Sequence, residues 1–268
     1  MLKANDRACA KSTKAKRWTW QSSDYLCAEI AEHTDTVVLS FSMGKDSLAA
    51  YIQLKRFFKN VHLYYLYLAP NIPFIDANIA YYEQEFGQKI VQLPSSIFAI
   101  NYAGFLFQPV TNVDKIDTAN FYTADKDKYN DTLAKAVKAY FNASLDTPVA
   151  DGVRADDNLN RRSAIVQYSP YNFNRNQFRP VYDWSKSDCF NEIRKAGIKL
   201  PVDYQLWGRT FEGYDYKFIK GLKMWLPESY EVLRSWYPFI ELEILRYENP
   251  IRGRAKELPN QFLLNYGH

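Results

Sequence analysis

The chain has 268 residues, which fits one large α/β domain or one domain with a helical appendage. It is 47% hydrophobic and 24% charged, as is typical of soluble globular proteins, and it has no apolar run near the ~20 residues of a membrane span. Its three cysteines are far apart and odd in number, which argues against a disulfide framework, a cysteine-ligated metal site and an iron–sulfur cluster. No apolar signal core follows the first residues, so we expect a cytoplasmic protein without membrane contact.

The net charge of +4 is unevenly placed along the chain. The first seventeen residues hold one acid, Asp6, and the six basic residues Lys3, Arg7, Lys11, Lys14, Lys16 and Arg17. A basic arm over residues 1–21 can bind the phosphate backbone of a nucleic acid. A solvated tail is the simpler interpretation, and both stay open.

From residue 22 to residue 93 the apolar spacing alternates between helix and strand. It predicts helices over 25–33, 45–58 and 74–86, and strands over 37–42, 61–68 and 89–93. This order predicts an α/β fold with a doubly wound, mostly parallel sheet of five strands and helices on both faces. Ligands of such sheets bind at the carboxyl ends of the strands.

The second half of the chain is less regular. Residues 94–127 show no clear period, and residues 101–105 are typical of a loop. Helical spacing returns over 128–141, 185–196, 228–236 and 239–247, with short extended pieces at 148–151 and 179–184. We expect a nucleotide-binding domain over 22–200 and a helical extension over 201–268 packed on the same core.

The stretch Ser40–Ser47, with the sequence SFSMGKDS, follows an apolar strand pattern and begins a helix pattern. The first N–H groups of a helix have no partner within the helix, and the helix dipole is positive there, so an anion fits this turn. Ser42, Lys45 and Ser47 add two hydroxyls and an ammonium. The stretch therefore predicts a site for a phosphorylated ligand; a helix capped by a serine without a ligand is the alternative.

Two more motifs follow in order. Gly152–Asp156, with the sequence GVRAD, comes after a short strand, where glycine allows close backbone approach and Arg154 can grip a phosphate or carboxylate. Arg161 and Arg162 follow one to two helical turns later. The segment 179–184, RPVYDW, precedes the polar helix start SKSD at 185–188.

The three motifs together resemble the PP-loop of the N-type ATP pyrophosphatases, and in particular the phosphoadenosine phosphosulfate (PAPS) reductase family. That family has S-F-S-G-G-K-D-S, G-x-R-x-[DE] and R-P-[IV]-x-D-W segments in this order. The resemblance covers residues 37 to about 200 and implies an adenine nucleotide alpha hydrolase-like fold. It also implies ATP and Mg²⁺ as cofactors, with the nucleotide between the loop and the end of the second strand. The residues it assigns to the nucleotide are Ser40, Ser42, Met43, Gly44, Lys45, Asp46, Ser47, Leu68, Gly152, Arg154 and Arg161.

The resemblance implies adenylation of an acceptor with release of pyrophosphate. Lys45, Asp46 and Arg154 are the expected catalytic residues, with Asp46 also a candidate Mg²⁺ ligand and Arg161 a second candidate for holding the acceptor. Met43 stands where the family has the first glycine, and a side chain there would limit how closely the loop wraps phosphates. The acceptor is unknown, with a nucleic-acid base or a metabolite as candidates, and a homodimer is possible.

The cysteine-bearing E-C-G-[IL]-H tail of the reductases is missing, since residues 258–268 contain no cysteine. Cys189 falls within a predicted helix and is expected to be a small buried residue. Two alternatives stay open. One is a sulfonucleotide reductase that uses the thiol of a partner, and the other is a nucleotide-binding regulatory partner of a DNA-binding protein without turnover.

Overall fold

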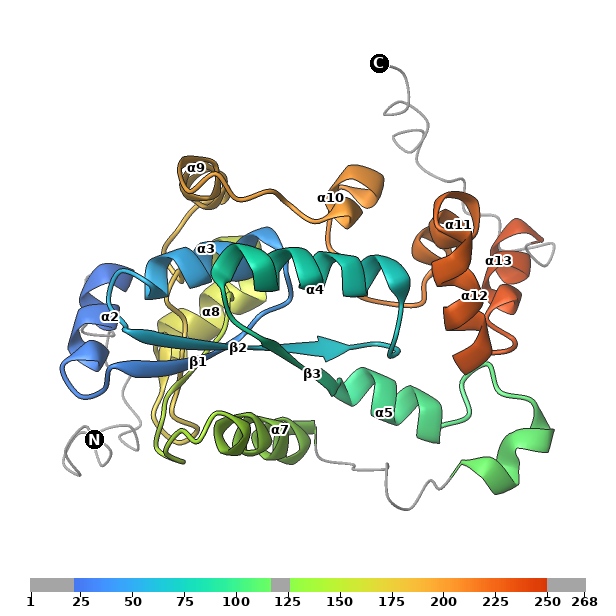
Figure 1. The fold of residues 1–268 in the computed structure, drawn as a ribbon, viewed down its shortest axis with the longest axis horizontal. Helices are drawn as coiled ribbons and strands as arrows, with labels where there is room; N and C mark the ends of the chain where they lie inside the picture. The colour runs from blue at the N-terminus through green and yellow to red at the C-terminus, as the bar shows by residue number, and fades with distance from the viewer. Residues whose placement is uncertain (1–21, 117–125, 250–268) are drawn as a thin grey trace.

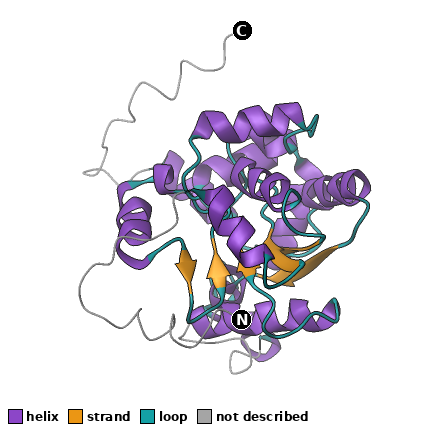
Figure 2. Cartoon of the chain, turned by 90° about the vertical axis from the view of Figure 1, so that its left-hand side faces the viewer, coloured by secondary structure: helices purple, strands orange, loops and turns teal. Residues whose placement is uncertain are grey.

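The computed structural model describes residues 22–116 and 126–249, so the basic arm lies outside the described residues. The chain forms an α/β fold in which a mostly parallel sheet lies between layers of helices (Figure 1, Figure 2). The first elements in chain order are α2 (Ser23–Ala31), β1 (Thr36–Ser40), α3 (Lys45–Leu54), β2 (Asn60–Tyr67), α4 (Pro73–Phe86) and β3 (Ile90–Pro94). The alternation predicted for this half is confirmed, because each helix and strand pattern was long enough to show its period.

The middle of the chain holds shorter elements. They are α5 (Ser96–Ala103), the 3₁₀ helix η1 (Val110–Lys115), α7 (Lys126–Tyr140), β4 (Val149–Ala150), the 3₁₀ helix η2 (Ala155–Asp157), α8 (Leu159–Tyr168), β5 (Tyr171–Asn172) and β6 (Gln177–Phe178). The loop predicted for 101–105 was wrong at its start, since α5 runs through Ala103. Ser95 caps this helix by accepting a hydrogen bond from the backbone N–H of Phe98. A serine at this position is a local signal for the start of a helix.

The sheet has the strand order β3-β2-β1-β4-β6-β5. All neighbouring strands are parallel except β5 and β6. The chain runs outward from β1 through β2 to β3 and then returns to β4 on the other side of β1. The topological switch point therefore lies between β1 and β4, where Val38 is paired with Val149.

The predicted number of five strands was wrong, because the described part of the sheet has six. The additional strand is β5, which pairs antiparallel with β6, with Tyr171 opposite Phe178. Strands of two residues leave no alternation that a sequence could show. The extended piece predicted for 179–184 was also wrong: β6 ends at Phe178, and the next residues form a turn in which Trp184 N–H donates to the Val181 carbonyl over 3.1 Å.

Alternate residues of the strands face different helices. Helices α3 and α4 cover one face of the sheet, and α5 and α7 lie on the other (Figure 1). Val38, Tyr64 and Val149 pack with Val137 of α7 in a small buried cluster. Leu39, one residue after Val38, belongs to the larger cluster on the opposite face.

The last part of the chain is helical. Its elements are α9 (Lys186–Lys195), α10 (Val202–Trp207), α11 (Tyr216–Trp225), α12 (Pro227–Trp236) and α13 (Glu241–Glu248). One buried hydrophobic cluster contains residues from Leu26 to Ile244. Phe74 of α4 contacts Trp207 and Phe211, with ring centroids 6.0 and 5.6 Å apart. In the described ranges, no helix combines the length and apolar character required to cross a membrane.

Candidate phosphate-binding site

The loop between β1 and α3 lies at the switch point of the sheet. β1 ends at Ser40, and α3 begins at Lys45 with Gly44 as its N-cap. The turn at Gly152–Arg154 follows β4, the parallel neighbour of β1. The first two motifs of the sequence therefore meet at the same edge, where ligands of doubly wound sheets bind.

Gly152 brings this second turn into direct contact with the start of α3. A Cβ at Gly152 would lie 2.8 Å from the backbone carbon of Asp46 and 2.8 Å from the backbone nitrogen of Ser47. Both atoms belong to the main chain, which cannot turn aside. Glycine at this position is thus a packing requirement of the loop.

Met43 adopts a left-handed backbone conformation, with a φ of 62°. Glycine reaches this region without strain, which gives a physical reason for the glycine of the family motif. The Met43 side chain is 0% exposed and belongs to the large hydrophobic cluster. The side chain therefore packs in the core.

The hydroxyls of the loop form a short chain of hydrogen bonds. The Ser42 hydroxyl donates to Ser47 Oγ over 3.2 Å, and the Ser47 hydroxyl donates to the Gly44 carbonyl over 2.9 Å. Ser47 is buried, whereas Ser42 is exposed. Ser42 is therefore the hydroxyl of this loop that an entering ligand can reach.

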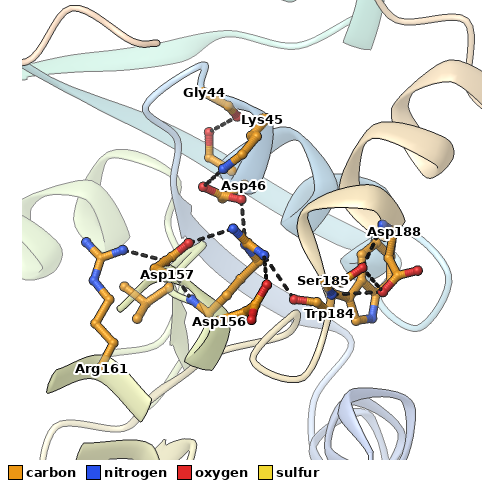
Figure 3. A network of polar contacts seen from close by, with 12 residues as sticks. Gly44, Lys45, Asp46, Asp156, Asp157, Arg161, Trp184, Ser185 and Asp188 are labelled. Carbon is orange, nitrogen blue, oxygen red and sulfur yellow. Dashed lines mark hydrogen bonds and ion pairs between the residues drawn. The ribbon is translucent and has the colours of Figure 1, made fainter. Parts of the chain in front are cut away.

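Asp46 lies between two cations. Its Oδ2 accepts a hydrogen bond from Lys45 Nζ over 2.6 Å, and its Oδ1 accepts one from Arg154 Nε over 2.7 Å (Figure 3). The Lys45 ammonium is held at the mouth of the loop by this pair. Because Arg154 keeps the other oxygen, Lys45 can leave Asp46 for a phosphate without leaving the carboxylate unpaired.

Arg154 is 3% exposed, and its guanidinium ties three segments together. Besides Asp46, it donates to the carbonyl of Trp184 over 3.0 Å and to Asp157 Oδ1 over 2.6 Å. Arg161 pairs with the same Asp157 and is 47% exposed in its side chain (Figure 3). The buried arginine thus holds the loop in place from beneath, and the exposed arginine is open to a ligand.

Cys189 of α9 reaches the same network. Its thiol is hydrogen-bonded to the Asp46 carboxylate. Burial raises the pKa of the Cys189 thiol to about 12, although the nearby Arg154 opposes this shift. Burial also raises the pKa of Cys27. Both thiols are buried and stay protonated at neutral pH, which is the inert form of cysteine.

Two residues of the C-terminal part lie on the loop and were missed by the sequence analysis. The hydroxyl of Tyr204 accepts a hydrogen bond from the backbone N–H of Lys45 over 3.1 Å. Thr210 Oγ1 lies 2.6 Å from the position that a Cβ on Gly44 would take. Neither residue belongs to a motif, and their contacts with the loop span about 160 residues of sequence, so no local pattern could reveal them.

Ser40 and Leu68 have other partners than the loop residues. Ser40 is hydrogen-bonded to Tyr64 and lines a cavity of about 710 Å³ under α7, on the other face of the sheet. Leu68 is buried, and its carbonyl accepts a hydrogen bond from the Tyr214 hydroxyl. Of the other predicted site residues, Asp46 and Ser47 lie against Gly152, Asp46 also pairs with Arg154, and Arg161 lies at the rim.

The loop can hold Mg²⁺ if the phosphates of a ligand supply the remaining coordinating oxygens. Among the described residues, no group of three or more His, Cys, Asp or Glu side chains could hold a metal by itself. Mg²⁺ at nucleotide sites is typically held by one or two carboxylates together with phosphates and water. Asp46, with 26% of its side chain exposed, fits that role once Lys45 moves off its Oδ2.

No protein-family model matches the chain, and no curated protein sequence matches it either. The structure is similar to an NH3-dependent NAD synthetase from Campylobacter jejuni, with 17% identity and a TM-score of 0.44 over 88% of this chain and 97% of that one. It is also similar to a PAPS reductase from Candida auris, with 11% identity and a TM-score of 0.40 over 74% of this chain and 100% of that one. These likenesses concern the overall path of the chain alone.

Proposed function

We propose that this chain binds ATP at the loop between β1 and α3 and transfers the adenylyl group to an acceptor, with release of pyrophosphate. The observation that carries the proposal is the group of donors at the start of α3. The N-terminal turn of the helix, the exposed Ser42 hydroxyl and the Lys45 ammonium lie together at the switch point of the sheet. These donors complement the negative charge of a phosphate chain.

The proposed roles follow from the contacts. Lys45 leaves Asp46 and neutralises the charge of the leaving pyrophosphate, and Ser42 donates a hydrogen bond to it. Arg154 acts as a positioning residue, because its buried guanidinium fixes Asp46 and the loop. Arg161, half-exposed at the rim, is the residue proposed to orient the acceptor. The acceptor oxygen attacks the α-phosphorus, and the bond from that phosphorus to the β-phosphate oxygen breaks.

Mg²⁺, when bound, would be held by Asp46 and would supply neutralisation of the phosphate charge. Catalysis in this scheme comes from positioning and charge compensation, without a covalent bond to the protein. The acceptor is proposed to be a nucleic-acid base or a metabolite, and the basic arm would serve the first of these. The chain is also proposed to act as a homodimer.

The test is direct. Purified protein is incubated with ATP and Mg²⁺, candidate acceptors are added, and pyrophosphate and adenylated product are measured. ATP affinity is measured in parallel by calorimetry for the wild type and for Lys45→Ala. We expect Lys45→Ala to weaken ATP binding by about tenfold or more, since a hydrogen bond to a charged group contributes about 1.5–3 kcal/mol.

Three outcomes would contradict the proposal. Equal ATP affinity in the wild type and in folded Lys45→Ala would remove the phosphate site. Tight ATP binding without pyrophosphate release across all acceptors would favour a non-catalytic regulatory partner. Release of sulfite from PAPS in the presence of thioredoxin would favour the reductase.

A further inference from the structure

The segment Asp203–Phe211, called the strap below, crosses the mouth of the candidate site. It runs through most of α10 and the turn after it. Its residue Tyr204 contacts Lys45, and its residue Thr210 faces Gly44. The strap therefore contacts the phosphate loop at Gly44 and at Lys45.

The backbone of the strap is firmly anchored. Asp203 is 0% exposed, and its carboxylate accepts hydrogen bonds from Phe211 N–H over 3.0 Å and from Asn78 Nδ2 over 3.2 Å. Trp207 and Phe211 both pack against Phe218, with ring centroids 5.3 and 5.2 Å apart. These contacts fix both ends of the strap to the core, so it does not open as a lid.

Unlike Asp203, Trp207 and Phe211, Tyr204 does not anchor the strap to the core. In the described part of the chain, its hydroxyl makes one hydrogen bond, to the Lys45 amide, and its ring stacks on no other aromatic ring. Tyr204 lines an open groove of about 580 Å³ between α9 and α10, together with Phe190, Arg194 and Lys199 among others. Tyr204 is half-buried beside this open groove.

The Tyr204 hydroxyl accepts its hydrogen bond from an amide that a bound anion would also need. The Lys45 N–H is one of the first-turn amides of α3 that have no acceptor within the helix. A hydrogen bond weakens steeply as the N–H···O angle falls, so one N–H cannot point well at two acceptors at once. A phosphate oxygen at this amide must therefore displace the tyrosine hydroxyl.

We propose that Tyr204 is a gate that senses occupancy of the phosphate site. Without ligand, its hydroxyl holds the Lys45 amide; when a phosphate takes that amide, the side chain rotates into the groove between α9 and α10. This inference rests on the proposed function, because it needs a phosphate at the start of α3. Binding of the nucleotide thereby changes the shape of the neighbouring groove, which carries the cations Arg194 and Lys199.

The experiment measures binding of inorganic pyrophosphate, with and without Mg²⁺, to the wild type and to Tyr204→Phe. Removing the hydroxyl removes the competitor, so we expect Tyr204→Phe to bind about fivefold more tightly, the equivalent of about 1 kcal/mol for a neutral hydrogen bond. Tyr204→Ala, which also lacks the ring, should bind at least as tightly. Tyr216→Phe is the matched control, because it loses a hydroxyl that contacts Lys220 on α11, away from the loop, and its affinity should be unchanged.

Unchanged or weaker pyrophosphate binding in folded Tyr204→Phe would overturn the gate, and weaker binding would make the hydroxyl a direct ligand. Lys45→Ala is measured in the same series to separate the two proposals. If Lys45→Ala binds as the wild type does, the proposed phosphate site itself fails. If Lys45→Ala weakens binding while Tyr204→Phe changes nothing, the gate alone fails.

Discussion

Gly152 lies directly against the peptide unit that follows Asp46, so closely that a Cβ at Gly152 would be 2.9 Å from the Asp46 carbonyl oxygen. The two residues are joined a second time through Arg154, whose Nε donates to the Asp46 carboxylate. The backbone contact and the side-chain ion pair thus fix the position of the β1–α3 loop relative to the turn after β4. The conformation of the phosphate loop depends on the turn after β4 as much as on its own sequence.

Gly152→Ala should destabilise the protein and distort the loop. The added methyl meets main-chain atoms, and overpacking of this kind costs about 1–3 kcal/mol, with the upper end expected here. The free energy of unfolding and the affinity for ATP should therefore both fall. Gly213→Ala is the control, because nothing lies within 4 Å of its Cβ position. Equal stability of the two variants would show that the contact is looser than the structure has it.

Gly44→Ala should collide with the strap rather than with the main chain. The new Cβ would lie 2.6 Å from Thr210 Oγ1, and the next strap atom, Thr210 Cβ, is 3.8 Å away. We expect a loss of stability of about 1 kcal/mol or more in Gly44→Ala and its recovery in Gly44→Ala/Thr210→Ala. A double-mutant cycle from denaturant unfolding measures this coupling. Additive effects would mean that Thr210 does not lie over the loop.

Arg154→Ala should destabilise the protein, because it removes a buried guanidinium that joins three segments. It leaves Asp46 with Lys45 and Asp157 with Arg161 as their remaining cations, so the loss should stay below the cost of a fully orphaned buried charge, about 3–5 kcal/mol. Arg154→Lys should recover only part of this loss, because an ammonium cannot reach three acceptors in a plane. Urea unfolding checks both variants.

Arg161→Ala is the matched comparison for the buried arginine. Its exposed pair with Asp157 should change stability by less than about 1 kcal/mol. If Arg161 orients the acceptor, the same variant should lower adenylation while ATP affinity stays unchanged. Full activity with every acceptor would remove Arg161 from the site.

Met43→Gly tests how backbone strain and side-chain burial at this position each affect stability. Glycine relieves a left-handed backbone that costs other residues about 1–2 kcal/mol, but the variant loses a fully buried side chain worth about 1.5–3 kcal/mol and gains backbone freedom in the unfolded chain. We expect a net loss of unfolding free energy together with equal or tighter ATP binding. Thermal melting and calorimetry give the two numbers independently. Much weaker ATP binding in the folded variant would mean that Met43 contacts the ligand.

Cys27 and Cys189 should be unreactive in the native protein. Burial raises both pKa values above the ordinary 9.0, so the thiolate is scarce in the folded state. In a Cys9→Ser background, a thiol reagent at pH 8 should label neither residue until the protein unfolds. Because the folded thiols bind protons more tightly, their contribution to stability is complete below pH 9 and is lost as the pH rises further. Fast native labelling of Cys189, with loss of activity, would support a reductase.

The sequence predicted the helices and strands in which the pattern of apolar residues repeats several times. The strands around Leu39 and Leu63 and the helix ended by Gly87, whose φ is 63°, were recoverable because their patterns repeat several times. The pair β5 and β6 was not, since its strands have two residues each. In the site, the residues of the loop were predicted by local chemistry, whereas Tyr204 and Thr210 meet it only through tertiary packing.

The buried side chain of Met43 has an evolutionary consequence. A change between methionine and glycine at this position alters the volume of the core as well as the backbone strain of the loop. Such a change is therefore tolerated best when a neighbouring core residue grows or shrinks at the same time. Among related chains, residue 43 should vary together with its core neighbours, while Gly44 and Gly152, which face a side chain and main-chain atoms, should stay fixed.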